Sequence, residues 1–72
     1  MSVIDQEVKS LIGQNIKALP EKEQMVISLY YYDELTYKEI GCVMGLTESR
    51  ISQIHSKAII MLKNILKSEG II

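Results

Sequence analysis

The fold is decided by residues 36–67, TYKEIGCVMGLTESRISQIHSKAIIMLKNILK. Thr36 can cap the start of a first helix, and Glu39 completes the spacing of a capping box. Gly45 predicts the end of this helix, because glycine adopts the left-handed conformation at little steric cost. Thr47 is a second N-cap candidate and opens a longer helix. The stretch therefore predicts a helix-turn-helix, a motif whose second helix enters the DNA major groove.

Further helices are predicted upstream of this motif, so the fold class is all-α: a small bundle of about four helices. Helices are expected over residues 3–19, 20–32, 36–44 and 47–67 of a single domain spanning residues 1–72. Apolar side chains at three- and four-residue steps mark the face of each helix that packs into the core. In chain order they are Val8, Leu11, Ile12, Ile16, Leu19, Met25, Val26, Leu29, Tyr30, Ile40, Val43, Met44, Ile51, Ile54, Ala58, Met61, Leu62 and Ile65, and Leu46 fills the turn.

Length and composition indicate one small folded domain. Of the 72 residues, 47% are hydrophobic and 24% are charged, which is typical of a globular chain and excludes intrinsic disorder. The single cysteine, Cys42, excludes an internal disulfide and is expected to be buried or half-buried on its helix. No apolar run is long enough to cross a membrane and no signal-peptide pattern is visible, so we expect a cytoplasmic protein.

Charge is distributed unevenly along the chain, although the formal net charge is only −1. Residues 1–46 carry four basic and seven acidic side chains, whereas residues 47–68 carry four basic side chains and one acidic one. The positive charge therefore lies on the second helix of the motif, where a DNA-binding protein needs it. Because few cations make few phosphate contacts, we expect weak DNA affinity that is lost at moderate salt.

The long helix places polar side chains opposite its core-facing stripe. Advancing by about 100° per residue, the side chains that point away from the core are Ser49, Ser52, Gln53, Ser56, Ile60, Lys63 and Lys67. Arg50 and Lys57 share one flank. Arginine, glutamine and serine suit base edges, and the lysines suit phosphates. Alone, such a face is more often an ordinary solvated surface, but next to the capped motif it favours DNA contact.

No pattern indicates an enzyme, a cofactor, a small-molecule substrate or a metal site. His55 lies beside the core stripe and has no second ligand at metal-binding spacing on its face. We expect a boundary residue, with a phosphate contact as the alternative. Cys42 and His55 lie on different predicted helices without an oxyanion motif, and the chain has no glycine-rich phosphate loop.

Several apolar residues remain after the core has been assigned. Ile60 projects opposite the core stripe, and with Ile59 and Leu66 it leaves apolar surface on the C-terminal half of the long helix. The tyrosine block at residues 30–32 is expected to plug the core with one or two rings and to leave the rest at its edge. The alternative is a protein-binding surface made of Tyr31, Tyr32, Ile59, Ile60, Lys63 and Leu66.

Three segments together carry a family resemblance: LPEKEQ at 19–24, LTYKEIG at 35–41 and GLTESRISQIH at 45–55. Over most of its length the chain is similar to region four of bacterial sigma factors. Within that family, the ESRISQIH wording resembles the motility (flagellar) type. Primary sigma factors usually have arginine where this chain has Glu48 and Ser52. The resemblance therefore does not extend to recognition of the housekeeping minus-35 sequence.

The resemblance implies a domain that binds the promoter minus-35 element within RNA polymerase holoenzyme and docks on the flap of the β-subunit. Its base-facing segment corresponds to Glu48, Ser49, Arg50, Ser52 and Gln53. Its contacts to the DNA backbone correspond to Thr36, Tyr37, Lys38 and Lys57, and we expect Thr47 and Ser56 to join them. The family also implies an anti-sigma factor or an activator as a partner of the same domain.

Two alternatives remain open. One is a stand-alone helix-turn-helix regulator that dimerises through Ile59, Ile60 and Leu66. The other is a protein-interaction module that an anti-sigma factor or activator binds and that makes no functional DNA contact.

Overall fold

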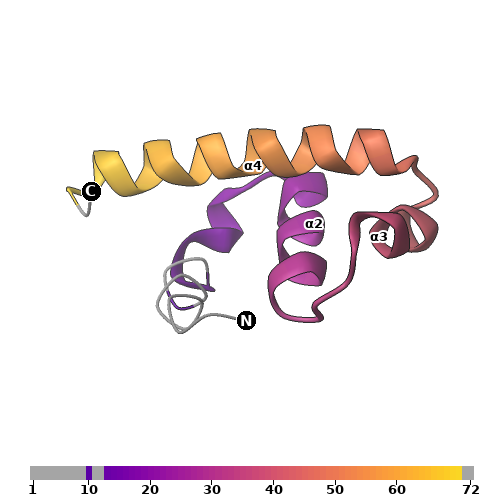
Figure 1. Cartoon of the computed structure of the whole chain (residues 1–72). Coiled ribbons are helices and arrows are strands. Elements are labelled where there is room, and N and C mark those ends of the chain that lie inside the picture. The colour runs from indigo at the N-terminus through magenta and orange to yellow at the C-terminus, as the bar shows by residue number, and fades with distance from the viewer. Residues whose placement is uncertain (1–9, 11–12, 71–72) are drawn as a thin grey trace.

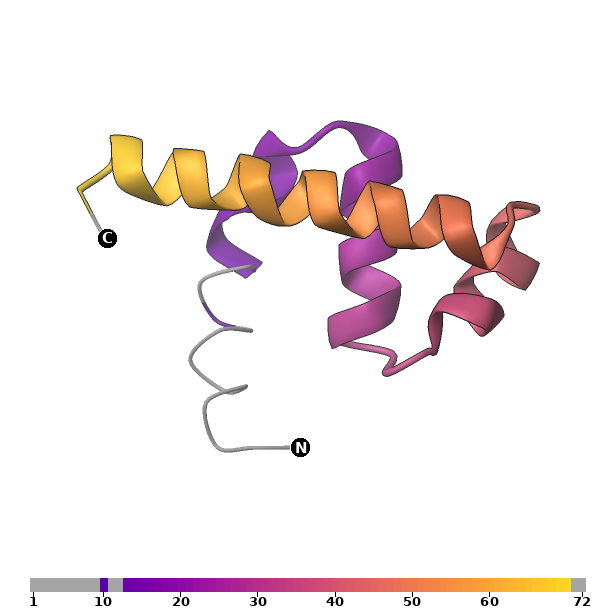
Figure 2. The same ribbon diagram turned by 45° about the horizontal axis from the view of Figure 1, so that its top comes forward.

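The computed structural model of the chain describes residue 10 and residues 13–70, and this part is built from helices (Figure 1). The elements are the 3-10 helix η1 (Ile16–Ala18) and the α-helices α2 (Glu21–Tyr31), α3 (Tyr37–Met44) and α4 (Glu48–Ser68). No strand occurs among the described residues, and the all-α prediction is confirmed. The longest helix, α4, runs along one side of the molecule, and Figure 2 shows α2 crossing it.

The two motif helices begin and end within one residue of the ranges expected from the sequence. Thr36 is the N-cap of α3, and Gly45 follows its last residue with a φ of 70°. Thr47 is the N-cap of α4, which ends at Ser68, close to the predicted end. Pro20 stands at the N-cap of α2, so that helix begins one residue later than predicted.

The helix predicted over residues 3–19 lies largely outside the described residues. The predicted core residues Val8, Leu11 and Ile12 fall in that part. Residues 13–15 are helical, but η1 then tightens the chain into a 3-10 turn and Leu19 is extended. The predicted α-helix therefore does not continue to residue 19. A chain about to enter Pro20 avoids the α conformation, because the proline ring clashes with the preceding residue.

The core has two parts, and both lie against α4. The motif cluster joins α2, α3 and the first half of α4, and its buried members are Val26, Ile40, Ile51 and Ile54. The C-terminal cluster joins α2 and the second half of α4, and its buried members are Leu19, Ile27, Ala58 and Leu62. The remaining predicted core residues that are partly buried and pack against one cluster are Ile16, Leu29, Tyr30, Met44, Leu46, Met61 and Ile65.

Three expectations about burial are wrong. Val43 is 62% exposed and Met25 is 42% exposed, although the apolar periodicity assigned both to the core. Cys42 is exposed as well. On α3 the buried face runs through Gly41 instead of Val43, because this glycine lies against the turn that follows. On α2, which both α3 and α4 cover, Ile27 is fully buried in the place expected for Met25.

Candidate nucleic-acid interface

The start of α3 is held by a complete capping box. The Thr36 hydroxyl oxygen accepts a hydrogen bond from the Glu39 backbone N–H at 3.1 Å, and the Thr36 N–H donates to Glu39 Oε1 at 2.8 Å. The first N–H groups of a helix have no partner within it. The box satisfies the amide of Glu39 and leaves those of Tyr37 and Lys38 at the helix start, beside the exposed Lys38 side chain.

The turn between α3 and α4 depends on two glycines. Gly45 adopts the left-handed conformation, and the Leu46 N–H donates back to the Gly41 carbonyl at 2.9 Å, as in a Schellman ending. A Cβ atom on Gly41 would lie 2.5 Å from the Leu46 carbonyl oxygen. The missing side chain therefore allows the close approach of α3 to its turn. Thr47 then caps α4 by accepting from the Arg50 N–H at 3.1 Å.

The outer face of α4 brings the arginine and the glutamine of this helix together. Arg50 Nη1 donates to Gln53 Oε1 at 3.3 Å, and both side chains are exposed. Glu48 and Ser49, in the first turn, are exposed too, whereas Ser52 is half-buried. Ser56, Lys57, Lys63 and Lys67 continue the exposed polar face along the helix. The predicted polar surface is therefore confirmed, with Ser52 at its edge.

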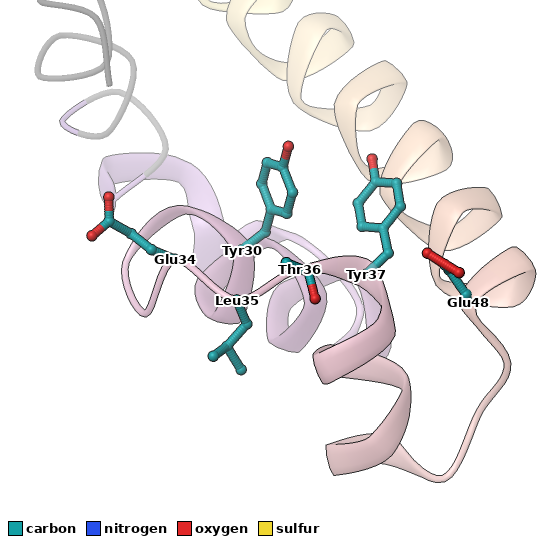
Figure 3. Close-up of a pocket in the computed structure, with 6 residues that line it drawn as sticks. All are labelled: Tyr30, Glu34, Leu35, Thr36, Tyr37 and Glu48. Atoms are coloured by element: carbon teal, nitrogen blue, oxygen red, sulfur yellow. The ribbon is translucent and has the colours of Figure 1, made fainter.

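A hollow lies where the α2–α3 loop meets the starts of α3 and α4 (Figure 3). Its volume is about 420 Å³. The residues that line it are Tyr30, Glu34, Leu35, Thr36, Tyr37 and Glu48. The rings of Tyr30 and Tyr37 point the same way, and Leu35 points in the opposite direction. The hollow is therefore lined both by the segment predicted to contact the DNA backbone and by the first residue predicted to face the bases.

An aromatic cluster that was not predicted from the sequence lies next to this hollow. His55 is half-buried and packs against Tyr30, Tyr31 and Tyr37, with ring centroids 4.7, 5.8 and 5.4 Å away. Burial lowers the pKa of His55 from its ordinary value of 6.5. Burial, and then the neighbouring Tyr30, raises the pKa of Tyr37 from 10.0. The expected boundary position of His55 is confirmed; the tyrosine block was the signal that could have located its neighbours.

The residues predicted to form a protein-binding surface differ in how much of each side chain is exposed. Ile60 is 59% exposed, and Lys63 is exposed beside it on the same helix. Ile59, Tyr31 and Leu66 are half-buried, and the first two pack against the C-terminal cluster. Tyr32 is 45% exposed, and its hydroxyl lies close to Gly13. Ile60 is therefore the predicted partner residue with the most apolar surface to offer.

The comparison with known protein families agrees with this geometry. The family described as "Sigma-70, region 4" matches residues 16–64. The chain belongs to this family. The match includes α2, α3, the turn and most of α4, so all of the motif cluster lies inside the region-four segment.

Curated relatives are also sigma factors. The chain is 51% identical to RNA polymerase sigma-D factor of Bacillus subtilis over 65 residues, which is 90% of this chain and 26% of that protein. It is 43% identical to RNA polymerase sigma factor FliA of Yersinia enterocolitica over 94% of this chain and 30% of that protein. FliA of Escherichia coli K12 is 44% identical over 89% of this chain and 27% of its own length. The predicted likeness to flagellar sigma factors is confirmed.

The described part of the chain has neither a cluster of metal-ligating side chains nor a helix suited to crossing a membrane. No three His, Cys, Asp or Glu side chains gather there closely enough to hold a metal ion. No helix among residues 13–70 is both long and apolar enough to cross a membrane.

Proposed function

We propose that this chain is the promoter-recognising region four of a sigma factor, and that α4 reads the minus-35 element in the major groove. The observation that supports this most directly is the exposed Arg50–Gln53 pair on a helix-turn-helix whose two helices are both capped. Arginine can donate two hydrogen bonds to guanine, and glutamine pairs with adenine in the same way. Ser49, Ser52 and Glu48 complete the base-facing set, and the Glu48 carboxylate suits the cytosine amino group.

Contacts to the DNA backbone belong, in this proposal, to the starts of both helices and the flank of α4. The residues involved are Thr36, Tyr37, Lys38, Thr47, Ser56 and Lys57. The unpaired first amides of a helix suit a phosphate, so Tyr37 contributes its backbone N–H. Its hydroxyl already faces His55. Lys38 adds a positive side chain at the same point. These contacts set the register of α4 and carry no sequence information themselves.

The low charge of the chain fits a region that does not hold DNA alone. The chain spans between 26% and 30% of the length of these relatives, and its formal net charge is −1. A domain tethered to a larger complex needs little affinity of its own, because tethering raises its effective concentration at the DNA. We propose RNA polymerase holoenzyme as that complex and the cytoplasm as its location. The chain then acts as a binding region and not as an enzyme.

A protein surface is also part of the proposal. Ile60, with Lys63 and the half-buried Leu66, lies on the C-terminal half of α4. We assign this surface to the polymerase β flap, with an anti-sigma factor or an activator as a competing partner. An exposed isoleucine opposite a core stripe suits such a contact, since apolar area drives association.

Fluorescence anisotropy tests the DNA-binding proposal. A duplex is first selected by the chain from a randomised pool, and a scrambled duplex of equal composition serves as the control. We expect preference for the selected duplex, with weak affinity that falls steeply as salt rises. Equal affinity for both duplexes would contradict base readout. Nanomolar affinity at physiological salt would contradict the tethering argument, and a dimer in analytical ultracentrifugation would favour the stand-alone regulator.

The docking proposal has its own test. Ile60→Ser is expected to weaken binding to purified core polymerase while leaving the affinity for the selected duplex unchanged. Unaltered binding to the polymerase would remove Ile60 from the docking surface. Val43 is an equally exposed apolar residue on α3. Val43→Ser is therefore the matched control, and we expect it to change neither the binding to core polymerase nor the affinity for the selected duplex.

A further inference from the structure

The aromatic cluster joins the three α-helices at one histidine. His55 belongs to α4, Tyr37 is the first residue of α3, and Tyr30 and Tyr31 are the last residues of α2. Tyr30 also contacts Tyr31 and Tyr37, with ring centroids 5.0 and 5.3 Å apart. The imidazole therefore lies at the junction of the helices and is packed by aromatic rings from two of them.

Each imidazole nitrogen faces a hydroxyl from a different helix. The Tyr37 hydroxyl is hydrogen-bonded to Nδ1 of His55. The Tyr31 hydroxyl lies 3.4 Å from Nε2. A neutral imidazole carries one donor nitrogen and one acceptor nitrogen, and a tyrosine hydroxyl can play either part. A single neutral tautomer therefore satisfies both contacts at once.

We propose that His55 is a positioning residue of the DNA-binding site: it ties the start of α3 and the end of α2 to α4 and thereby orients Arg50 and Gln53 toward DNA. The proposal rests on the proposed function, because it concerns how the base-facing side chains are placed. The turn after Gly45 joins α3 and α4 at one end only. In addition to the packing of the motif cluster, the Tyr37–His55 contact joins the other end of α3 to α4, about two helical turns beyond the start of α4, and so restrains the angle between the helices.

Protonation of the imidazole would disturb this arrangement. The doubly protonated ring has two donors and no acceptor, so both hydroxyls would have to accept and turn their own protons elsewhere. The groups that face His55 are the hydroxyls and rings of Tyr30 and Tyr31 from α2 and Tyr37 from α3. The carboxylates near this cluster, Glu34 and Glu48, line the hollow on which Tyr30 and Tyr37 also border. Burial lowers the pKa of His55, which agrees with a neutral ring.

Nuclear magnetic resonance tests the cluster without DNA. The chain has one histidine, so its ring signals need no assignment among several. We expect one dominant neutral tautomer that titrates below the ordinary value of about 6.5 because the ring is half-buried. Tyr37→Phe removes the partner of Nδ1, so we expect it to shift the ring toward the other tautomer or a mixture of the two. Mixed tautomers that titrate at the ordinary value in the native chain would overturn the proposal.

The effect on DNA binding is measured with His55→Phe and Tyr37→Phe. Each substitution keeps an aromatic ring and removes a hydrogen-bonding group. Each is expected to lower affinity for the selected duplex by about three- to tenfold, the value of one hydrogen bond, with affinity for the scrambled duplex unchanged. Because the hydrogen bond that Tyr37→Phe removes is one of the two that His55→Phe removes, the double variant should be no weaker than His55→Phe alone. Tyr32→Phe removes a tyrosine hydroxyl that lies beside Gly13. It is the control for the loss of a hydroxyl, and we expect it to leave the affinity for both duplexes unchanged. Equal losses on both duplexes, or additive losses, would contradict a positioning role.

The sign of the pH effect separates positioning from a direct phosphate contact. If His55 positions the helices while neutral, acidification from pH 7.5 to 5.5 weakens binding to the selected duplex in the native chain and not in His55→Phe. If His55 instead contacts a phosphate, acidification strengthens binding, because the cation is favoured, and the proposal falls. Failure of the native chain to distinguish the two duplexes at any pH would refute the proposed function and the DNA-orienting role alike, while the ring signals would still report the cluster itself.

Discussion

The two halves of α4 bury the same kind of stripe and present different surfaces. Ile51 and Ile54 lie in the motif cluster, and Ala58 and Leu62 continue the stripe into the C-terminal cluster. Outside, the first half is small and polar around Arg50, whereas the second half carries an exposed isoleucine among lysines. The difference teaches that the buried stripe serves the fold along the whole helix, whereas the two proposed functions are assigned to different parts of its outer surface.

The two halves also differ in how firmly they are held. The first half is packed by α2 and α3, begins with a side-chain cap at Thr47, and is joined to both helices through His55. The second half packs against α2 and Leu19, and its end is closed by backbone bonds near Glu69. Stability within one domain varies with such contacts. The half proposed to read bases is the half whose orientation is most strongly restrained.

The largest effect is expected from truncation in the motif cluster. Ile51→Ala removes a fully buried side chain and should lower the free energy of unfolding by about 3–4 kcal/mol, because a cavity replaces the lost contacts. Urea denaturation followed by circular dichroism measures it. Ile60→Ala on the opposite face is the control, with an expected change within about 0.5 kcal/mol. Similar urea midpoints for the two variants would show that the motif cluster is not the centre of the fold.

A smaller loss of stability is expected from the turn. Gly41→Ala should cost about 2 kcal/mol, because the new Cβ meets the Leu46 carbonyl oxygen and the turn must shift. Gly45→Ala meets nothing within 4 Å but must keep a left-handed φ, so it should cost about 1 kcal/mol. Thermal unfolding ranks the two. A stabilising Gly41→Ala would mean that α3 does not approach its turn as closely as described.

Within the outer surface, the first half should dominate DNA specificity. Arg50→Ala is expected to lower affinity for the selected duplex by about 1–3 kcal/mol and to relax preference at one base. Lys67→Ala, far along the second half, should change affinity little and only through the salt dependence. Anisotropy titrations at two salt concentrations compare them. A larger effect of Lys67→Ala would reverse the assignment of the two halves.

The smallest expected effects concern the caps. Thr47→Ala and Thr36→Ala each remove the acceptor of an N-cap hydrogen bond and should cost about 1 kcal/mol of stability. Thr36→Ser and Thr47→Ser keep the acceptor and are the matched controls, with nearly native urea midpoints. If the serine variants lose as much stability as the alanine variants, the methyl groups matter and the caps do not.

Local structure was largely determined by the sequence itself. The capping box at Thr36, the cap at Thr47 and the left-handed Gly45 involve neighbours within a few residues, so short-range chemistry is sufficient to place the helix ends. The stripe of α4 was equally predictable, because a helix of 21 residues leaves little doubt about which face is apolar. The polar face of the segment proposed to read bases then follows as the opposite side of the helix.

Tertiary structure decided the burial of the short helices and the aromatic cluster. An eight-residue helix such as α3 shows too few apolar positions to settle its inward face, and close packing through Gly41 outweighed the hydrophobicity of Val43. The meeting of Tyr31, Tyr37 and His55 joins residues 18 and 24 positions apart. No local preference brings such residues together. Their contact arises because α2 and α3 pack against the same part of α4.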